Sequence, residues 1–386
     1  IAERSEIKSD DSACNFADFT FDSAMEQWLV PLINGCRLVI RDELWSAEQA
    51  YHILIEQGVS WFEMPPAYLT EIARWAEQQG LTLPLRACSV GGEAVSKENL
   101  AQIRRVVGDA PIVNGYGPTE TLITPLVWSA HKNTECDTAY APIGTGVGER
   151  TLYILDKDLN PLPLGAIGEL YIGGPCLARG YHGRPDLTAE RFIPDPFAAD
   201  GGRLYRTGDL VRFRVDGNVD YFGRGDHQIK LRGYRIELGE IEAQVLSHPA
   251  VSEAVAIADG EGSDKRLLVY AVGAGEMAVD ELKRYLQSRL PDYMIPAQII
   301  LLGRLPRLTS GKLDRKALPK PEWTTEQNFR APQTEAERAL TDIWQDVLGL
   351  DRIGIDDNFF ELGGDSILSI RVVSRAREAG WQFTPR

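Results

Sequence analysis

The stretch NGYGPTET, residues 114–121, follows an apolar run, PIV, that is typical of a buried strand. Its two glycines let the backbone approach a ligand closely. Tyr116 offers an aromatic face, and Thr119 and Glu120 supply oxygens of the kind that phosphate groups and Mg²⁺ bind. Taken alone, the stretch is equally compatible with a structural turn after a strand. The surrounding sequence is needed to distinguish a ligand-binding loop from such a turn.

Helical and strand-like segments alternate upstream of this stretch, over residues 48–113. Helical periodicity in AEQAYHILIEQG, PAYLTEIARWAEQQG and SKENLAQIRRVVG separates the strand-like runs VSWFEMP, LRACSV and PIVNGYG. Residues 17–40 form a turn, a helix and a strand by the same criteria. This alternation predicts a parallel sheet covered by helices, with the ligand site beyond the carboxyl ends of the strands.

The pattern changes after residue 140, where Gly-rich, strand-like runs such as GELYIGG and LVRFRVDGNVDYFG follow one another. VDGN within the second run predicts a hairpin turn. Farther on, the chain alternates between helix and strand again, and PKPEWTTEQNFRAPQ has the composition of a linker. Thr334 and Glu337 form a capping box ahead of an amphipathic helix, and another helix is expected to begin near Ser366.

The predicted fold class is therefore α/β plus α+β, in several domains, as the length of 386 residues also indicates. We predict five segments: an α/β part at 1–140, a β-rich subdomain at 141–225, a small α+β subdomain at 226–318, a linker at 319–333, and a helical unit, cut short, at 334–386.

Composition excludes several classes of protein. The net charge of −15 and the lack of clustered Lys and Arg argue against nucleic acid as a partner. No apolar run is long enough to span a membrane and no signal peptide is visible, so we expect a cytoplasmic protein without a membrane partner. The five cysteines are scattered without the spacing of a zinc site and are expected to be reduced.

Three further polar motifs each have two interpretations. YRTGDL, residues 205–210, ends near an Asp that either binds a ribose diol or forms a turn. GRGDHQIKLRGYRIE, residues 223–237, is either an anion-binding hinge or a solvated basic loop. LGGDSILS, residues 362–369, either caps a helix or presents Ser366 as an attachment point.

The order of these motifs resembles that of the adenylation domains of nonribosomal peptide synthetases, which belong to the adenylate-forming superfamily. GGEA, NGYGPTET, GELYIGG, YRTGDL, GRGDHQIKLRGYRIELGEIE, LPDYMIP and LTSGKLDRKAL occur here in the family's order. FFELGGDSILSIRVVSRAREAG resembles the peptidyl carrier domain that follows in such enzymes. The resemblance implies the superfamily's large subdomain, its small C-terminal subdomain and a carrier. It also implies ATP, Mg²⁺ and 4′-phosphopantetheine as cofactors.

By this resemblance the protein activates an amino acid as aminoacyl-AMP and transfers it to the carrier thiol. Tyr116 would stack on adenine, with Asn114 in the same motif. Asp209 would bind the ribose, Arg224 the ribose or a phosphate, Thr119 a phosphate and Glu120 the Mg²⁺. The nucleotide's other side would be lined by Gly92, Glu93 and Ala94.

Three further roles follow from the same resemblance. Lys312 matches the catalytic lysine, whose ammonium would offset the repulsion between the substrate carboxylate and the α-phosphate. Asp226 matches the hinge between the subdomains. Ser366 would carry phosphopantetheine, attached by a phosphopantetheinyl transferase. Adjacent synthetase domains (condensation, thioesterase or the next module) are the expected partners, and a siderophore or peptide antibiotic is the expected kind of product.

The family's substrate-pocket positions indicate a basic amino acid. They fall on Asp22, Ser23, Glu26, Glu63, Ser89, Gly91, Gly115, Ile123 and Thr124. Asp22 matches the residue that holds the substrate α-ammonium. Two nearby carboxylates repel each other by roughly 4 kcal/mol at about 4 Å, which a cationic side chain such as that of ornithine, N-modified ornithine, lysine or arginine would relieve. The alternative is that Glu26 or Glu63 points to solvent.

The family's Ser/Thr/Gly-rich phosphate loop is not found in these 386 residues. We therefore expect the sequence to begin within an adenylation domain and to stop within a carrier. The alternative is a split or defective enzyme. Two other functions stay open at this point: an acyl-CoA or aryl-acid ligase of the same superfamily, and a catalytically silent carrier or docking fragment.

Overall fold

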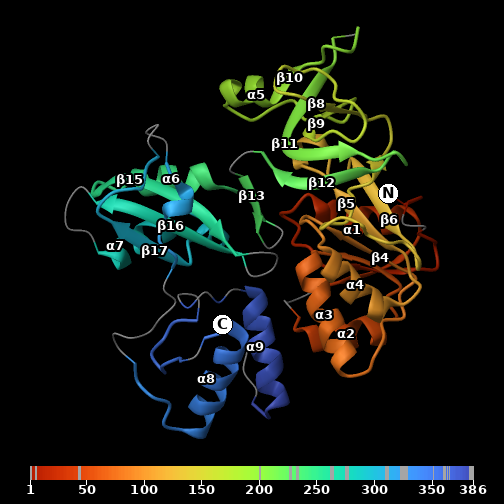
Figure 1. The fold of residues 1–386 in the computed structure, drawn as a ribbon. Coiled ribbons are helices and arrows are strands. Elements are labelled where there is room, and N and C mark those ends of the chain that lie inside the picture. The colour runs from red at the N-terminus through yellow and green to blue at the C-terminus, as the bar shows by residue number, and fades with distance from the viewer. Residues whose placement is uncertain are drawn as a thin grey trace. The chain divides into compact units, whose positions relative to one another are not determined.

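A computed structural model describes residues 2–4, 7–41, 45–199, 201–225, 228–231, 234–260, 265–273, 278–308, 313–321, 329–350, 352–359, 362, 364 and 366–381. The chain divides into two compact units, residues 1–226 and 227–386 (Figure 1).

A seven-stranded sheet forms the centre of the first unit, with the order β2-β1-β3-β4-β5-β6-β7. Its strands are β1 (Ser12–Asn15), β2 (Arg37–Ile40), β3 (Trp61–Met64), β4 (Ala87–Gly91), β5 (Ile112–Tyr116), β6 (Leu126–Ala130) and β7 (Thr145–Gly146). The first five are parallel, whereas β6 and β7 are antiparallel to their neighbours. The parallel sheet predicted from the βα alternation is therefore confirmed.

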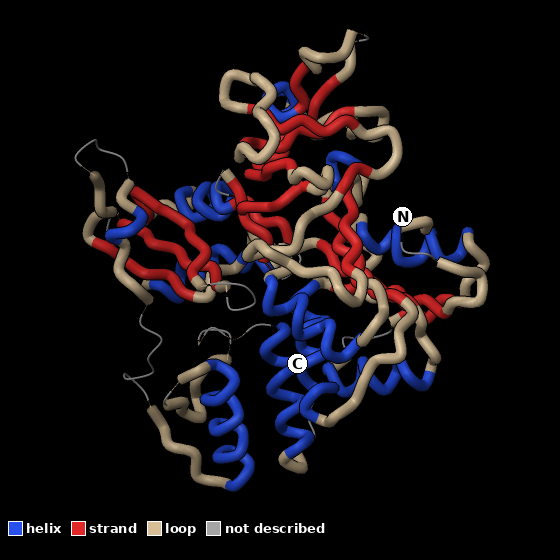
Figure 2. Tube along the Cα trace, turned by 45° about the vertical axis from the view of Figure 1, so that its right-hand side comes forward, coloured by secondary structure: helices blue, strands red, loops and turns tan. Residues whose placement is uncertain are grey.

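Four helices connect the parallel strands: α1 (Ser23–Ile33), α2 (Ala47–Glu56), α3 (Pro66–Gln78) and α4 (Lys97–Val107). Local sequence explains where two of them begin, because Ser46 and Gln49 form a capping box for α2 and Ser96 caps α4. Figure 2 shows helices, in blue, flanking the red strands of this sheet. The strand order reverses at β1, so the carboxyl ends of β1 and β3 form the switch point where open α/β sheets bind ligands.

A second, antiparallel sheet completes the first unit, with the order β10-β11-β9-β8 and β12 paired to β11. Its strands are β8 (Thr151–Leu155), β9 (Gly168–Gly173), β10 (Phe192–Pro194), β11 (Arg203–Phe213) and β12 (Val219–Arg224), and helix α5 spans Pro185–Arg191. The predicted VDGN hairpin is confirmed, because β11 and β12 pair on either side of it. Buried side chains of both sheets form one apolar cluster that includes Tyr116, Leu126, Ile172 and Val211.

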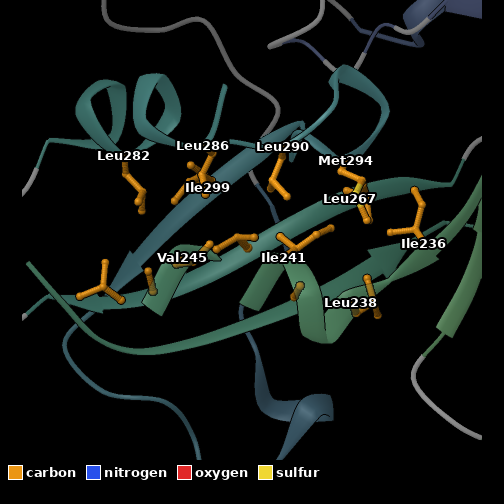
Figure 3. Close-up of a cluster of buried hydrophobic side chains, with 14 of the residues drawn as sticks. Ile236, Leu238, Ile241, Val245, Leu267, Leu282, Leu286, Leu290, Met294 and Ile299 are labelled. Atoms are coloured by element: carbon orange, nitrogen blue, oxygen red, sulfur yellow. The ribbon is translucent and has the colours of Figure 1, made fainter. Parts of the chain in front are cut away.

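The second unit begins with the hairpin β13 (Gln228–Leu231) and β14 (Tyr234–Glu237) and continues into an α+β layer. A three-stranded sheet of β15 (Val251–Asp259), β16 (Arg266–Gly273) and β17 (Gln298–Leu302) packs against α6 (Leu238–Leu246) and α7 (Val279–Gln287). In Figure 3, Ile241 and Val245 of α6 and Leu282 and Leu286 of α7 meet over this sheet. Short 3₁₀ turns lie at Asp292–Met294 and Arg315–Ala317.

Two helices follow in the C-terminal segment, α8 (Glu335–Leu348) and α9 (Ser366–Glu378). The capping box of Thr334 and Glu337 is present at the start of α8, as predicted. The core of this C-terminal segment is formed by buried residues that include Val347, Leu348, Phe359, Leu368 and Val372. None of the helices in the described residues has both the length and the apolar character needed to cross a membrane.

Candidate active site

Three carboxylates gather at the switch point of the parallel sheet: Asp22, Glu26 and Glu63, here called the acidic cluster. Asp22 caps α1, the helix that follows β1, and Glu26 lies one turn farther along that helix. Glu63 is on β3, where its register partner on β4 is Ser89. The carboxyl ends of the sheet's strands thus hold these side chains where a ligand is expected.

Glu63 is the most buried member of the cluster, with 9% of its surface exposed. Burial raises the pKa of Glu63 well above its usual value, and the charges of Glu26 and Asp22 raise it further. Among the described residues, no cationic side chain acts on this carboxylate to offset the rise. A carboxylate in such surroundings is stable in its charged form only beside a cation.

Thr124 contacts Glu26 directly, because its hydroxyl donates to Glu26 Oε2 over 2.9 Å. Burial raises the pKa of Glu26, and the Thr124 hydrogen bond offsets part of that rise. Thr124, which holds Glu26, lies beside Gly115, and Gly91 lies beside both Gly115 and Glu63 Oε1, so the two carboxylates face the same region. This arrangement argues against the alternative in which Glu26 or Glu63 points to solvent.

Glycines keep the space beside the acidic cluster open. A Cβ atom on Gly91 would lie 3.8 Å from Glu63 Oε1 and 3.1 Å from the Gly115 carbonyl oxygen. A Cβ atom on Gly115 would lie 3.1 Å from Thr124 Cγ2. Ser89 is buried, whereas Ser23 and Ile123 are partly exposed. The structure thus brings the predicted substrate positions of α1, β3, β4 and β5 together.

Asp209, Arg224 and Tyr116 form a second cluster, here called the paired cluster. Asp209 and Arg224 are register partners on β11 and β12, and Arg224 Nη1 donates to Asp209 Oδ1 over 3.0 Å. The Tyr116 hydroxyl donates to Asp209 Oδ2. Thr207 completes the network, because its hydroxyl accepts the Asp209 backbone N–H over 3.0 Å. Both oxygens of the buried Asp209 carboxylate are thus hydrogen-bonded within the protein.

Tyr116 is 6% exposed and belongs to the apolar cluster between the two sheets. Burial raises the pKa of its hydroxyl well above 10, and the Asp209 charge adds to this effect. Asn114, on the same strand, donates its side-chain amide to the Pro142 carbonyl over 2.9 Å. Gly92, Glu93 and Ala94 follow the end of β4 and are less buried than these two side chains.

The turn that carries Thr119 and Glu120 is a 3₁₀ segment, Thr119–Thr121. The Tyr181 hydroxyl donates to Glu120 Oε1 over 2.5 Å, and the Ala178 N–H donates to the Glu120 carbonyl over 2.8 Å. Gly117 precedes the turn and admits no side chain, because a Cβ atom there would lie 1.9 Å from the Ile123 carbonyl oxygen. Close packing against the Ile123 backbone therefore requires glycine at position 117.

Some predicted site residues lie outside the described residues, namely Lys312 and Asp226. Ser366 is the first residue of α9. Gly364, two residues earlier, is buried, and a Cβ atom there would lie 2.3 Å from ring atoms of Phe359. The glycine before the predicted attachment serine is thus required by packing.

Sequence reasoning missed three residues that support these clusters: Tyr181, Thr207 and Arg150. Tyr181 holds the Glu120 carboxylate, and Thr207 holds the Asp209 backbone. Arg150 donates to backbone carbonyls of the turn after Glu120. TGD in YRTGDL was the one signal that could have drawn attention to Thr207, whereas Tyr181 and Arg150 meet their partners only through the fold.

Three protein-family models match this chain. The AMP-binding enzyme family matches residues 1–182, the AMP-binding enzyme C-terminal domain matches residues 240–312, and the phosphopantetheine attachment site matches residues 338–386. The fold and these matches define an adenylate-forming enzyme domain followed by a carrier domain.

Relatives narrow the class further. The chain is 43% identical over 385 residues to a component protein of the linear gramicidin synthase of Brevibacillus parabrevis, covering 97% of this chain and 7% of that protein. It is 42% identical over 373 residues to a dimodular nonribosomal peptide synthase of Bacillus subtilis (strain 168), covering 94% of this chain and 16% of that protein. The chain thus spans a small part of the relatives that it matches.

A solved structure of similar organisation is a holo nonribosomal peptide synthetase protein with adenylation and carrier domains, bound to a vinylsulfonamide inhibitor. It matches with a TM-score of 0.80 and 25% identity, covering 97% of this chain and 62% of that one. The adenylation domain AlmE of Vibrio cholerae, in complex with glycyl-adenosine-5′-phosphate, matches with a TM-score of 0.71 and 26% identity, covering 82% of this chain and 60% of that one. The chain belongs to the adenylation and carrier domains of nonribosomal peptide synthetases.

Proposed function

We propose that the protein activates an amino acid with a cationic side chain as its adenylate and transfers the aminoacyl group to phosphopantetheine on Ser366. The family membership supports the reaction class. The single observation that carries the choice of substrate is the acidic cluster, in which the buried Glu63 carboxylate has no described cation beside it. Ornithine, N-modified ornithine, lysine, arginine and diaminobutyrate all supply a cation of suitable reach.

The paired cluster fits the ribose end of a nucleotide. A carboxylate has about four lone-pair positions, so Asp209 can accept ribose hydroxyls while it keeps Tyr116 and Arg224. Because these two partners fix both carboxylate oxygens, the acceptor is already oriented before a ligand arrives. In this proposal the Tyr116 ring, Asn114, Gly92, Glu93 and Ala94 line the adenine side.

Glu120 fits a magnesium site of the kind that the nucleotide itself completes. Among the described residues there is no group of three or more His, Cys, Asp or Glu side chains that could hold a metal ion. Mg²⁺ commonly binds one or two carboxylates together with substrate phosphates. Glu120, held by Tyr181, would supply that carboxylate, and Thr119 would contact a phosphate. Lys312 and the hinge at Asp226 keep their proposed roles from the family motifs.

Asp22 would hold the substrate α-ammonium while it caps α1. Its Oδ1 accepts the Ser23 N–H over 2.8 Å, so the carboxylate has a fixed orientation at the helix start. Glu26 and Glu63 would then receive the cationic side chain. The small residues Ser23, Ser89, Gly91 and Gly115 leave room for its methylene groups, and Ile123 and Thr124 supply the opposite wall.

On the carrier, phosphopantetheine would be attached to Ser366 by a phosphopantetheinyl transferase. A serine at the start of a helix, preceded by glycines, fits a modification site that an enzyme has to approach. The thiol of the attached group would accept the aminoacyl chain and present it to adjacent synthetase domains.

Amino-acid-dependent exchange of pyrophosphate into ATP tests the activation step, with a panel of basic and neutral amino acids. We expect the highest kcat/KM for a basic amino acid. A preference for leucine, phenylalanine or another neutral residue over every basic one would refute the substrate proposal. The absence of exchange with all of them would refute activation itself.

Loading of the carrier is tested by intact mass after incubation with coenzyme A and a phosphopantetheinyl transferase. The mass should rise by one phosphopantetheine arm, and Ser366→Ala should abolish the gain while Ser369→Ala retains it. Transfer of the aminoacyl group to free coenzyme A in preference to the carrier would favour an acyl-CoA ligase instead.

A further inference from the structure

Two consecutive residues with positive φ follow the Glu120 turn. Leu122 has a φ of 62° and Ile123 a φ of 58°, although neither is glycine. A left-handed conformation costs a non-glycine residue about 1 kcal/mol or more, and a β-branched side chain adapts to it poorly. Such a pair persists only where the surrounding structure holds it, and strained backbone of this kind concentrates at functional sites.

Arg150 provides much of that support. Its Nη2 donates to the Thr121 carbonyl over 3.4 Å and to the Leu122 carbonyl over 3.2 Å, and its Nη1 donates to the Val147 carbonyl over 2.6 Å. The guanidinium therefore bridges the strained turn to the segment that leads into β8. A planar fork with several donors suits this geometry, and a lysine ammonium does not reproduce it.

The strained turn leads directly into the substrate positions. Ile123 has positive φ itself, and Thr124 comes next, with its hydroxyl on Glu26. Pro125, one residue farther, accepts the Val147 N–H over 2.8 Å, so both sides of the turn are tied to the segment that Arg150 contacts. Movement of the turn would displace Thr124 and release the Glu26 carboxylate from its hydrogen bond.

The charge of Arg150 also acts on the acidic cluster. The Arg150 guanidinium lowers the pKa of Glu26 slightly against the larger rise caused by burial. Among the described residues, Arg150 forms no ion pair with a carboxylate, and its buried Nε has no hydrogen-bond partner. Its donors are directed at backbone carbonyls, which is the arrangement of a residue that fixes a loop.

We propose that Arg150 is a positioning residue for amino-acid selection, which holds the backbone at Thr121 and Leu122 and so places Ile123 and Thr124 in the substrate pocket. This inference rests on the proposed function. It assigns to Arg150 a larger effect on the amino acid than on the nucleotide, because Tyr181 and the Ala178 N–H also hold Glu120.

Arg150→Met and Arg104→Met form a matched pair for the test. Arg104 also donates to several backbone carbonyls, those of Gly108, Ala110 and Ala130, but on the α4 side of the sheet. With whichever amino acid the wild type activates best, Arg150→Met should raise the amino-acid KM about tenfold, the effect of losing hydrogen bonds that orient Glu26. The KM for ATP should stay within about twofold, and Arg104→Met should alter neither.

Hydrogen–deuterium exchange supplies a readout that does not depend on activity. Segment 118–127 should exchange about tenfold faster in Arg150→Met than in wild type and should be unchanged in Arg104→Met. An Arg150→Met protein with wild-type exchange in this segment, or with amino-acid and ATP KM values raised alike, would overturn the inference.

The two readouts separate the inference from the proposed function. Preference for a neutral amino acid would refute the cationic substrate while leaving the Arg150 comparison intact. If no amino acid supports pyrophosphate exchange, the proposed function fails, and the exchange of segment 118–127 alone supports or overturns the positioning role.

Discussion

The paired cluster and the acidic cluster both bury a carboxylate in the first unit, but they treat its charge in opposite ways. Asp209 is 3% exposed and receives hydrogen bonds from Arg224 and Tyr116. Glu63 is 9% exposed and, among the described residues, only burial and other carboxylates act on it. A buried charge needs a partner. The protein supplies the partner for Asp209, whereas in the proposed function the cationic substrate supplies the partner for Glu63.

Arg224→Met should have the largest effect on stability, because it removes the ion-pair partner of the buried Asp209 carboxylate. Removing one partner of a buried ion pair costs about 3–5 kcal/mol, and the side chains of Arg224 and Asp209 are 8% and 4% exposed. The free energy of opening, measured by amide hydrogen exchange in β11 and β12, should fall by this amount.

Arg212→Met is the matched control for this change. Arg212 pairs with the buried Asp220 on the same two strands, but Asp220 also pairs with Arg214. The loss should therefore be smaller than for Arg224→Met. Equal losses in the two variants would show that the packing of the arginine, and not the charge of Asp209, determines the cost.

Glu63→Gln should remove the preference for cationic substrates. Loss of a charged, buried contact reduces kcat/KM for the preferred basic amino acid by about 100-fold, or about 2.7 kcal/mol. Neutral amino acids of similar size should lose much less. Pyrophosphate exchange measures both, and Glu56→Gln, an exposed position at the end of α2, serves as the control. Equal losses for basic and neutral substrates would contradict the role of the charge.

The same substitution should stabilise the protein above neutral pH. The pKa of Glu63 lies above its usual value of 4.5 in the folded protein. The folded protein therefore holds a proton that the unfolded chain releases, and stability falls as pH rises from about 4.5 toward the raised pKa. Relative to wild type, Glu63→Gln should gain about 1–3 kcal/mol at about pH 8 and nothing near pH 4.

Amide hydrogen exchange of β3 at several pH values measures this gain. Addition of the preferred amino acid should reduce the difference in stability between Glu63→Gln and wild type, because the ligand stabilises only the wild type. A Glu63→Gln protein that is less stable than wild type at high pH would show that the carboxylate has a partner in the folded protein.

Fold and site differed in how far the sequence predicted them. Alternating helical and strand-like runs predicted the parallel sheet, and the VDGN turn and the Thr334 capping box were local signals that the structure confirms. Strand order was not predicted, because the jump of β3 over β1 depends on long-range pairing that no local pattern contains. β7 joins the first sheet by pairing with β6, again through a long-range contact.

In the candidate site, the order of the motifs predicted the site residues, but it did not predict which hydrogen-bond partners these residues have. The motif around Asp209 gave no indication that Tyr116 and Arg224 occupy its two oxygens, since these residues lie 93 and 15 positions away. Tyr181 and Glu120 are 61 positions apart. The Arg224 contact depends on the exact register of β11 with β12, which the VDGN turn alone does not give because the register shifts between Leu210 and Val211. The Tyr116 contact forms only when the two sheets pack together, and the sequence near either residue does not indicate it.

Thr124→Val should have the smallest of these effects, because it removes one hydrogen bond from the acidic cluster. Burial raises the pKa of Glu26 and the Thr124 hydroxyl offsets part of the rise, so the variant should hold its Glu26 proton to higher pH. The KM for the basic amino acid should rise about threefold to tenfold and should increase more steeply than in wild type as pH falls. Thr70→Val, which removes a buried 2.7 Å bond to the Pro66 carbonyl in α3, should change neither. A pH-independent rise in KM would assign Thr124 a packing role, and the comparison between the clusters would then rest on Glu63 alone.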